Sequence, residues 1–363
     1  MPQSSVTPSP AFRRRPEWER HAATWLVWPH CQDTWPGLVL AEAVEPAYVA
    51  MIDALRTGET VRVIVQSAAH AATVGARLAA AGIASAVEDG APHADGPAVR
   101  LHVWPTDDEW IRDFGALVVA DDAGHRLATD WRFNAWGGKY DRTEQNNTVP
   151  RLMAAAHGLE RRAYDVILEG GSVDVDGTGL ALTTESCLLN PNRNPGLGRA
   201  DIEALLAEGL GVTETIWLGD GIAGDDTDGH VDDFARFVAP RTVVVAEETD
   251  PGDANHAPLA EASARLRAWR GADGRGLDVH ALPMPPPLWH TTEAGARERL
   301  PASYANFLIG NAAVLMPAFD APQDDAAAEV LERLVGRPVA RIPARSLVWG
   351  LGACHCLSQD VPA

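Results

Sequence analysis

The amino-acid sequence predicts one α/β domain over residues 1–363, with many short strands and fewer helices. Stretches with strand-like alternation and stretches with helical periodicity follow one another along the chain, which is the pattern of α/β folds. No low-complexity linker divides the chain, and hydrophobic residues make up 46% of it, enough for a sizeable core. The 32 glycines and 26 prolines are spread throughout, which favours short elements joined by tight turns over long helical bundles.

Each element is predicted from its local pattern. Residues 60–65 alternate as a strand does, and residues 68–82 follow with a helical pattern that stops at a glycine. Apolar runs predict further strands at 99–103, 115–119, 212–218, 242–246 and 339–342, and helical periodicity predicts helices at 201–209, 259–270 and 326–334. The remaining predictions are strand or helix–strand structure at 302–309 and 313–316, a rigid proline loop at 283–287 and a flexible lead-in at 1–15.

The formal net charge of −20 restricts the partners. Binding to nucleic-acid phosphates needs a basic face, so no nucleic-acid partner is expected, whereas a cationic ligand fits an acidic protein. The sequence has neither a basic-then-apolar leader nor a run of 18 apolar residues, so we expect no secretion signal and no membrane span. Four cysteines are too few for a disulfide framework, which fits a cytoplasmic location and a free thiol used for chemistry.

Three motifs point to a bound cofactor or metal, and each has a structural alternative. Residues 219–224 have the G-x-G-x-x-G spacing of a dinucleotide loop, but aspartates follow and no apolar helical pattern begins there. Residues 174–185 place acidic groups as a calcium loop does, but a β-hairpin turning at Asp176-Gly177 is the better interpretation. The run Cys354-His355-Cys356 resembles half of a zinc site, but no second pair of similar spacing exists.

Polar and reactive residues gather near glycines in four segments that strand-like runs flank. Glycines let the backbone approach a ligand closely, so these segments are candidates for one functional site. The four segments are Trp110-Ile-Arg-Asp113, Leu168-Glu-Gly-Gly171, Asp225-Asp-Thr-Asp-Gly-His-Val-Asp232 and Gly350-Leu-Gly-Ala-Cys-His-Cys356.

These residue types suit attack on the carbon of a guanidinium group. The thiol of Cys356 is a candidate nucleophile, which needs a base or a cationic neighbour because the ordinary pKa of a cysteine is about 8.5. His230 can act as acid and base near neutral pH. Asp113 and Asp232 could bind the planar guanidinium fork. Each residue alone has a plainer explanation, as an apolar buried cysteine, a structural ion pair or a surface loop; their joint presence favours chemistry.

The motifs resemble those of the agmatine deiminases and the related bacterial peptidylarginine deiminases, of the guanidine-modifying superfamily. The resemblance runs from near the N-terminus to the end of the chain. It is carried by Pro16-Glu-Trp-Glu19, Thr24-Trp25, Trp28-Pro29, Trp110-Ile-Arg-Asp-Phe-Gly115, Phe133-Asn-Ala-Trp-Gly-Gly-Lys139, Leu168-Glu-Gly-Gly-Ser172, Thr183-Thr-Glu-Ser-Cys-Leu-Leu-Asn190, Asn192-Arg-Asn-Pro195, Gly224-Asp-Asp-Thr-Asp-Gly-His-Val-Asp232, Ala302-Ser-Tyr-Ala-Asn306 and His355-Cys356.

The resemblance implies a pentein fold, or α/β propeller: five strand-rich αβ modules around a pseudo-fivefold axis, with the active site in the central channel. It implies no metal and no organic cofactor. The family's residues fall on Cys356 as nucleophile, His230 as general acid–base, Glu169 as the group that orients this histidine, Asp113 and Asp232 as guanidinium ligands, and Trp110 in the substrate pocket. The implied activity is agmatine deiminase, which converts agmatine to N-carbamoylputrescine and ammonia through a covalent thiouronium.

The resemblance leaves alternatives. Leu351, Ala353 and Asp360 depart from the family's usual residues around the nucleophile, where glycine, asparagine and glutamine are common. Rival activities are deimination of arginine, a methylarginine or a peptidylarginine, and transfer of the amidino group to an amine. A different class is a non-catalytic binding or calcium protein. The expected partner is a small cationic guanidine, and a homodimer is the candidate assembly.

Overall fold

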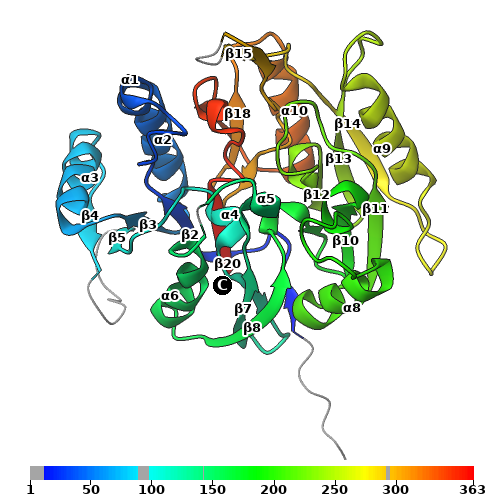
Figure 1. Ribbon diagram of the computed structural model, residues 1–363, viewed down its shortest axis with the longest axis horizontal. Helices are drawn as coiled ribbons and strands as arrows, with labels where there is room; N and C mark the ends of the chain where they lie inside the picture. The colour runs from blue at the N-terminus through cyan, green and yellow to red at the C-terminus, as the bar shows by residue number, and fades with distance from the viewer. Residues whose placement is uncertain (1–11, 89–97, 142, 292–294) are drawn as a thin grey trace, which may run out of the picture.

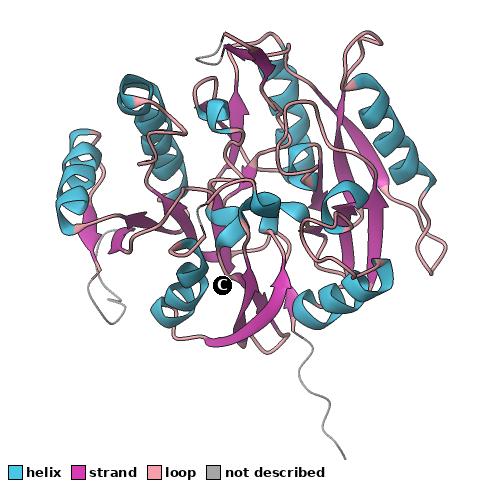
Figure 2. Cartoon of the chain, in the orientation of Figure 1, coloured by secondary structure: helices cyan, strands magenta, loops and turns pink. Residues whose placement is uncertain are grey.

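The computed structural model describes residues 12–88, 98–141, 143–291 and 295–363. Within these ranges the strands form five sheets of three to five strands and one two-stranded ribbon. The longer helices lie at the periphery and the strands lie further in (Figure 1), as the colouring by secondary structure also shows (Figure 2). Every helix of the described ranges is too short or too polar to cross a membrane.

Four of the sheets repeat one arrangement of consecutive elements. An antiparallel pair of strands is followed by a helix, and the next strand returns parallel to the second one. A parallel pair needs such a crossover, because the chain must come back to the same end of the sheet. The four sets are β6 (Leu117–Ala120), β7 (Arg126–Arg132), α6 (Val149–Ala156) and β8 (Glu160–Ile167); β9 (Asp174–Val175), β10 (Leu180–Thr184), α8 (Arg199–Leu210) and β11 (Glu214–Leu218); β12 (Ala235–Ala239), β13 (Thr242–Glu247), α9 (His256–Ala268) and β14 (Asp278–Pro283); and β17 (Leu308–Ile309), β18 (Val314–Ala318), α10 (Gln323–Val335) and β19 (Val339–Pro343).

The fifth sheet joins the two ends of the chain. Its order is β20-β2-β3-β5-β4, and the C-terminal strand β20 pairs antiparallel with β2, so that Trp25 lies opposite Gln359. Helix α2 connects β2 to β3, and helix α3 connects β3 to β4. The elements are β2 (His21–Val27), α2 (Glu45–Leu55), β3 (Thr60–Val65), α3 (Ala68–Ala80), β4 (Ser85–Val87), β5 (Val99–Val103) and β20 (Ser358–Pro362). The residues just before β20 therefore lie beside elements from the first third of the chain.

Short elements complete the described structure. The ribbon consists of β15 (Trp289–Thr291) and β16 (Arg297–Arg299), and β1 (Arg13–Arg14) pairs antiparallel with β6. The short helices are α1 (Gly37–Val39), η1 (Leu40–Val44), α4 (Ile111–Phe114), α5 (Ala135–Gly138), η2 (Asn146–Thr148), η3 (Gly170–Ser172), α7 (Glu185–Leu188), η4 (Val231–Asp233) and η5 (Leu347–Gly350). Several of these short helices carry the residues of the candidate site.

The central strands are apolar on both faces. In β3, the side chains of Val61, Val63, Ile64 and Val65 are all buried, as expected for an inner strand of a parallel sheet that is covered on both sides. Burying each of these side chains contributes about 1.5–3 kcal/mol relative to leaving it in water. This burial makes the sheets firm supports for the loops that extend from their ends.

Most predicted elements exist, with ends shifted by a few residues. The strands at 60–65 and 99–103 are confirmed as β3 and β5, and the hairpin at 174–185 is confirmed by the antiparallel pairing of β9 with β10. Residues 219–224 are followed by turns, not by a helix. At 302–309, only the last two residues form a strand. Ten strands of the described ranges lie where none was predicted: β1, β2, β4, β7, β8, β12, β14, β15, β16 and β20.

The lead-in predicted as flexible at 1–15 is described only from residue 12 onward. Residues 1–11 lie outside the described residues, but Arg13 and Arg14 form β1. Arg14 is buried because its guanidinium pairs with the carboxylate of Asp360 and donates to the carbonyl oxygen of Val118 at 3.2 Å. These buried partners order a segment whose composition is that of a loop.

Candidate functional site

The four reactive segments of the sequence converge at the ends of different sheets. Asp113 lies in α4, Glu169 directly precedes η3, and His230 directly precedes η4, which contains Asp232. Cys356 lies two residues before β20. Short helices and turns at these positions allow each loop to leave its sheet and aim one side chain inward.

Gly171 shows how closely three of these side chains approach one another. A β-carbon built on this residue would lie 2.6 Å from His230 Nδ1, 2.9 Å from Asp113 Oδ1 and 3.0 Å from Asp232 Oδ2. Real β-carbons do not approach other atoms so closely, so this position requires glycine. The Gly171 N–H also donates to Asp113 Oδ1 at 3.0 Å.

The Cys356 thiol is almost fully buried and is surrounded by acceptors. Its Sγ lies 3.7 Å from Asp232 Oδ2 and accepts a hydrogen bond from Asn306 Nδ2 at 2.9 Å. Burial raises the pKa of the thiol well above its ordinary value, and the carboxylates of Asp232, Asp233 and Asp113 raise it further. Without a cation in the site, Cys356 is therefore held as the neutral thiol.

His230 is fully buried between two carboxylates. Its Nδ1 lies 3.7 Å from Asp113 Oδ1 and its Nε2 lies 4.0 Å from Glu169 Oε2. Neither ring nitrogen has a hydrogen-bond partner among the described residues. Burial acts to lower the pKa of His230, but the neighbouring Asp113, Cys187 and Glu169 outweigh it and raise the pKa well above its ordinary value. A histidine with both nitrogens unengaged is available to a substrate or a water molecule.

Glu169 is anchored from the side opposite His230. Arg193 Nε donates to Glu169 Oε1 at 2.8 Å, and both side chains are fully buried. Arg193 also donates to the carbonyl oxygen of Thr227 at 2.7 Å and pairs with Asp228. Arg193 thus links Glu169 to the loop that carries His230.

Asp113 is held by donors on both oxygens. Besides the Gly171 N–H on Oδ1, the indole Nε1 of Trp136 donates to Oδ2 at 2.9 Å. Burial is the main reason that the pKa of Asp113 is raised, to about 6. Trp136 and its neighbour Ala135 adopt left-handed backbone conformations, each with a φ of 53°, which non-glycine residues rarely adopt and which often mark functional sites.

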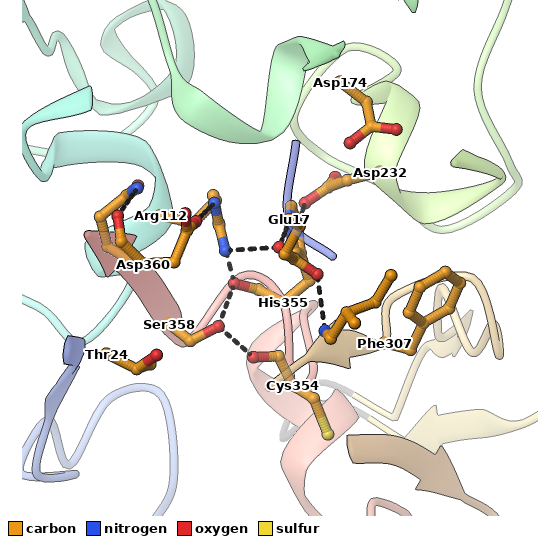
Figure 3. Close-up of polar contacts among 12 residues, drawn as sticks. Glu17, Thr24, Arg112, Asp174, Asp232, Phe307, Cys354, His355, Ser358 and Asp360 are labelled. Carbon is orange, nitrogen blue, oxygen red and sulfur yellow. Dashed lines mark hydrogen bonds and ion pairs between the residues drawn. The ribbon is translucent and has the colours of Figure 1, made fainter. Parts of the chain in front are cut away.

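Asp232 has two oxygens in different environments. Its Oδ2 lies 2.6 Å from His355 Nδ1, whereas its Oδ1 is buried without a hydrogen-bond partner in the described structure. Burial acts to raise the pKa of Asp232, but the hydrogen bond and the charge of His355, with His230 and Arg236, lower it below its ordinary value. The close-up in Figure 3 shows His355 between Asp232 and Glu17.

A cavity of about 170 Å³ leads to this cluster. Trp110, Asp113 and Cys356 line it. Glu169, His230 and Asp232 are not among the lining residues, but His230 lies beside Asp113 and Asp232 lies beside Cys356. The wall includes three further acidic residues, Asp33, Asp108 and Asp226, and the remaining lining residues are Thr34, Trp136, Tyr140, Thr227, Trp349, Gly350, Leu351 and Gly352. Within the described ranges, the lining therefore contains no lysine, arginine or histidine.

Two groups of residues in the described structure could supply three ligands to a metal ion. They are Glu169 with Cys187 and His230, and Asp232 with Asp233 and Cys356, and in each group the ligand atoms lie within 4.8 Å of one another. Cys354 belongs to neither group, and burial raises the pKa of its thiol, which disfavours the thiolate that zinc would need. The zinc interpretation of residues 354–356 thus has no support in this geometry.

Comparison with known proteins places the chain among guanidine-modifying enzymes. A model of the Porphyromonas-type peptidyl-arginine deiminases matches residues 13–362. The chain belongs to this family. It is 38% identical to the agmatine deiminase of Stutzerimonas stutzeri strain A1501, over 96% of this chain and 94% of that protein.

Solved structures agree over nearly the whole chain. The agmatine deiminase of Enterococcus faecalis is 30% identical and superposes with a TM-score of 0.84, covering 97% of this chain and 96% of that one. An amidinotransferase of saxitoxin biosynthesis from Microseira wollei is 14% identical with a TM-score of 0.50, over 97% of both chains, and shares only the fold. The chain therefore has the fold of the pentein superfamily.

Sequence reasoning missed several residues of the site. Asn306 donates through Nδ2 to Cys356 Sγ and to Asp233 Oδ1, each at 2.9 Å, and its Oδ1 accepts the backbone N–H groups of residues 353 and 355 at 3.1 Å. Trp136 anchors Asp113. Both lie in motifs that carry the family resemblance, but only the contacts show what they hold.

The three departures from the family pattern occupy different surroundings. Leu351 lines the cavity, and its backbone is left-handed with a φ of 70°. Ala353 is buried and donates its N–H to Asn306. Asp360 lies outside the cavity lining and instead pairs with Arg14 and Arg112. Of the three, only Leu351 is placed to contact a bound substrate.

Proposed function

We propose that this protein is an agmatine deiminase, which hydrolyses the guanidinium group of agmatine to N-carbamoylputrescine and ammonia. The observation that carries the proposal is the buried thiol of Cys356, which lines an acidic cavity together with Asp113 and lies 3.7 Å from Asp232. His230 lies 3.7 Å from Asp113. Similarity to agmatine deiminases over the full length of the chain supports the same activity.

In this proposal Asp113 and Asp232 bind the guanidinium, Trp110 forms the pocket wall, and Cys356 is the nucleophile. The carboxylates raise the pKa of the thiol in the free protein. A bound guanidinium offsets their charge and favours the thiolate, whose proton passes to solvent, so the substrate activates its own nucleophile. This order of events keeps Cys356 unreactive until the cavity is occupied.

The first half of the reaction forms a C–S bond. The Cys356 thiolate attacks the guanidinium carbon to give a tetrahedral adduct, His230 donates a proton to one nitrogen, and the C–N bond breaks to release ammonia. The raised pKa of His230 suits a group that enters the reaction protonated. Glu169, which Arg193 holds in place, orients this imidazole.

The second half removes the thiouronium that remains. Neutral His230 takes a proton from water, and the hydroxide adds to the same carbon. The C–S bond then breaks, the hydroxyl proton passes to solvent, where it protonates the released ammonia, and the ureido product leaves. The Cys356 thiolate and protonated His230 of the substrate-bound state are thereby restored, and the thiolate takes up a proton from solvent when no cation occupies the site.

The cavity wall favours agmatine over arginine. Agmatine ends in an ammonium group, and Asp33, Asp108 and Asp226 supply carboxyl groups along the wall. Free arginine would need a basic partner for its α-carboxylate, and the described lining contains none. The absence of a basic residue from the described lining likewise disfavours other substrates that carry a free carboxylate.

We further propose that the five sheets are five strand-rich αβ modules of an α/β propeller, arranged around a pseudo-fivefold axis, within one catalytic domain. The repeated order of antiparallel strand, helix and parallel strand supports this arrangement. Pairing of β20 with β2 would close the ring, and the site residues would then come from loops that face the central channel.

An ammonia-release screen tests the proposed function. The purified protein is assayed with agmatine, arginine, methylarginines and arginyl peptides, and we expect the highest kcat/KM with agmatine. Cys356→Ser should retain less than about a hundredth of the wild-type rate, because covalent catalysis is lost. Cys31→Ser is the matched control and should retain full activity. Ammonia release from none of these compounds, or a fully active Cys356→Ser, would contradict the assignment.

A further inference from the structure

A second buried histidine, His355, lies between two carboxylates (Figure 3). Its Nδ1 lies 2.6 Å from Asp232 Oδ2, and its Nε2 lies 3.0 Å from Glu17 Oε2. An ionised carboxylate only accepts hydrogen bonds, and a neutral imidazole has a single N–H. Both contacts can be hydrogen bonds at once only if both ring nitrogens carry a hydrogen.

Glu17 is held as an ionised carboxylate by other donors. Its Oε1 accepts from Arg236 Nη2 at 3.0 Å and from the Ile309 N–H at 2.7 Å, and its Oε2 accepts from Arg112 Nη2 at 3.2 Å. Burial acts to raise the pKa of Glu17, but the charges of Arg236, His355 and Arg112 lower it well below its ordinary value. Glu17 therefore stays a fixed acceptor on the far side of His355.

The contact with His355 gives the two carboxylate oxygens of Asp232 different surroundings. Oδ2 is engaged by the imidazole, and Oδ1 is left buried without a partner in the described structure. A buried carboxylate oxygen without a donor is costly, so such an atom usually has a ligand or a water molecule as its partner. The free oxygen is the one that can accept a hydrogen bond from a guanidinium N–H.

We propose that His355 is a positioning residue: as an imidazolium held by Glu17, it fixes one oxygen of Asp232 and leaves the other free to bind the guanidinium. The proposal rests on the proposed function, because the role of Asp232 as a guanidinium ligand comes from it. His355 contacts no reacting atom in this scheme, and it acts through Asp232.

The charges around the pair show what would change without His355. Asp232 faces the acidic groups Asp113 and Asp233 and the Cys356 thiol, and the cations near it are His355, His230 and Arg236. His355 itself faces Glu17 and Asp174, with Arg112 donating to its carbonyl oxygen. Removing the imidazolium leaves Asp232 beside two other carboxyl groups, which should raise its pKa and favour its protonated form.

Nitrogen NMR of the wild-type protein, with its histidines isotopically labelled, tests the protonation state of the His355 ring. The resonances of His355 are assigned by comparison with His355→Gln. We expect both ring nitrogens to carry a hydrogen at about pH 7, because each of them contacts a carboxylate oxygen. A neutral His355 ring at this pH would overturn the proposal, whatever the activity of the protein.

Steady-state kinetics tests the positioning. His355→Gln keeps a donor for Asp232 but removes the charge, and Glu17→Gln removes the second anchor without touching Asp232. Both should raise the KM for agmatine at least about 10-fold with a smaller fall in kcat, because guanidinium binding is weakened. The fall of kcat/KM at acidic pH, its acid limb, should also begin at a higher pH and become steeper. A purely structural defect would not cause such a shift.

The matched control is His102→Gln, which removes another buried histidine that lies 3.3 Å from a carboxylate, that of Glu88, away from the cavity. His102→Gln should leave the KM for agmatine and the acid limb of the kcat/KM profile unchanged. Folded His355→Gln and Glu17→Gln proteins with wild-type KM and wild-type acid limbs would overturn the proposal. If His355→Gln does not fold, the kinetics of Glu17→Gln still decide. A wild-type protein that releases no ammonia from agmatine would instead contradict the proposed function, and the NMR result would then stand by itself.

Discussion

Asn306 Nδ2 lies 2.9 Å from the sulfur of Cys356, and the Oδ1 of the same amide accepts backbone N–H groups from the loop that carries this cysteine. One side chain thus aims the nucleophile and fixes its loop. A donor to the sulfur also acts to lower the pKa of the thiol, against the burial and the carboxylates that raise it.

Replacing Asn306 should impair catalysis more than binding. In Asn306→Ala the sulfur loses its donor and the loop loses its acceptor, so we expect kcat to fall by about 100-fold or more with a smaller change in KM. Ammonia release under saturating agmatine measures the change. Asn311→Ala, at a half-buried bend away from the cavity lining, is the control for loss of an asparagine. Wild-type kcat in a folded Asn306→Ala would contradict the role of this contact.

Asp113 should set the acid limb of activity. Its pKa is raised to about 6, mainly by burial, and it must be ionised to bind the guanidinium. Because a carboxyl group with a raised pKa is protonated below that value, kcat/KM should be maximal above about pH 7 and fall as the pH decreases through about 6. A pH profile of kcat/KM for agmatine checks this. A constant value down to about pH 4.5 would show that Asp113 is ionised throughout, contrary to the expectation.

A methyl group at residue 171 should inactivate the protein. In Gly171→Ala the new β-carbon would lie 2.6 Å from His230 Nδ1 and 2.9 Å from Asp113 Oδ1, so these groups must separate. We expect a loss of activity of at least about 100-fold, since displacements of about 1 Å in a catalytic site have such effects. Gly75→Ala, within helix α3 with ordinary contacts at 3.7 Å and beyond, should stay active and be slightly more stable. An active Gly171→Ala would show that the site tolerates this separation.

Asp226 should contribute to binding of the substrate's far end. It lines the cavity, and the hydroxyl group of Tyr140 donates to its Oδ2 at 2.6 Å. Asp226→Asn should raise the KM for agmatine about 10-fold and leave the KM for butylguanidine, which lacks the terminal amine, almost unchanged. Asp122→Asn, at an exposed ion pair with Arg13, is the control. An equal effect on both substrates would place the terminal ammonium elsewhere.

The unpredicted strands show where local pattern fails. Strand β8 begins Glu160-Arg-Arg162, and its first four residues are exposed, so it lacks the apolar alternation by which strands are recognised. It is a strand because its backbone pairs in parallel with β7 at the edge of a sheet. Strand β20 is similar: its polar residues Ser358, Gln359 and Asp360 are buried only because β2, from the other end of the chain, lies beside it.

The sequence by itself determined the α/β class, most of the inner strands and the residues with reactive side chains, because apolar patterning and chemical type are local properties. It also identified the family through motifs spread over the whole chain. Only the tertiary structure decided which of these residues meet. The convergence of Asp113, Glu169, His230, Asp232 and Cys356 depends on loops from separate sheets, and the partners of His355 and Asn306 lie from 47 to more than 300 residues away. Long-range pairing of this kind is set by packing, which no local pattern records.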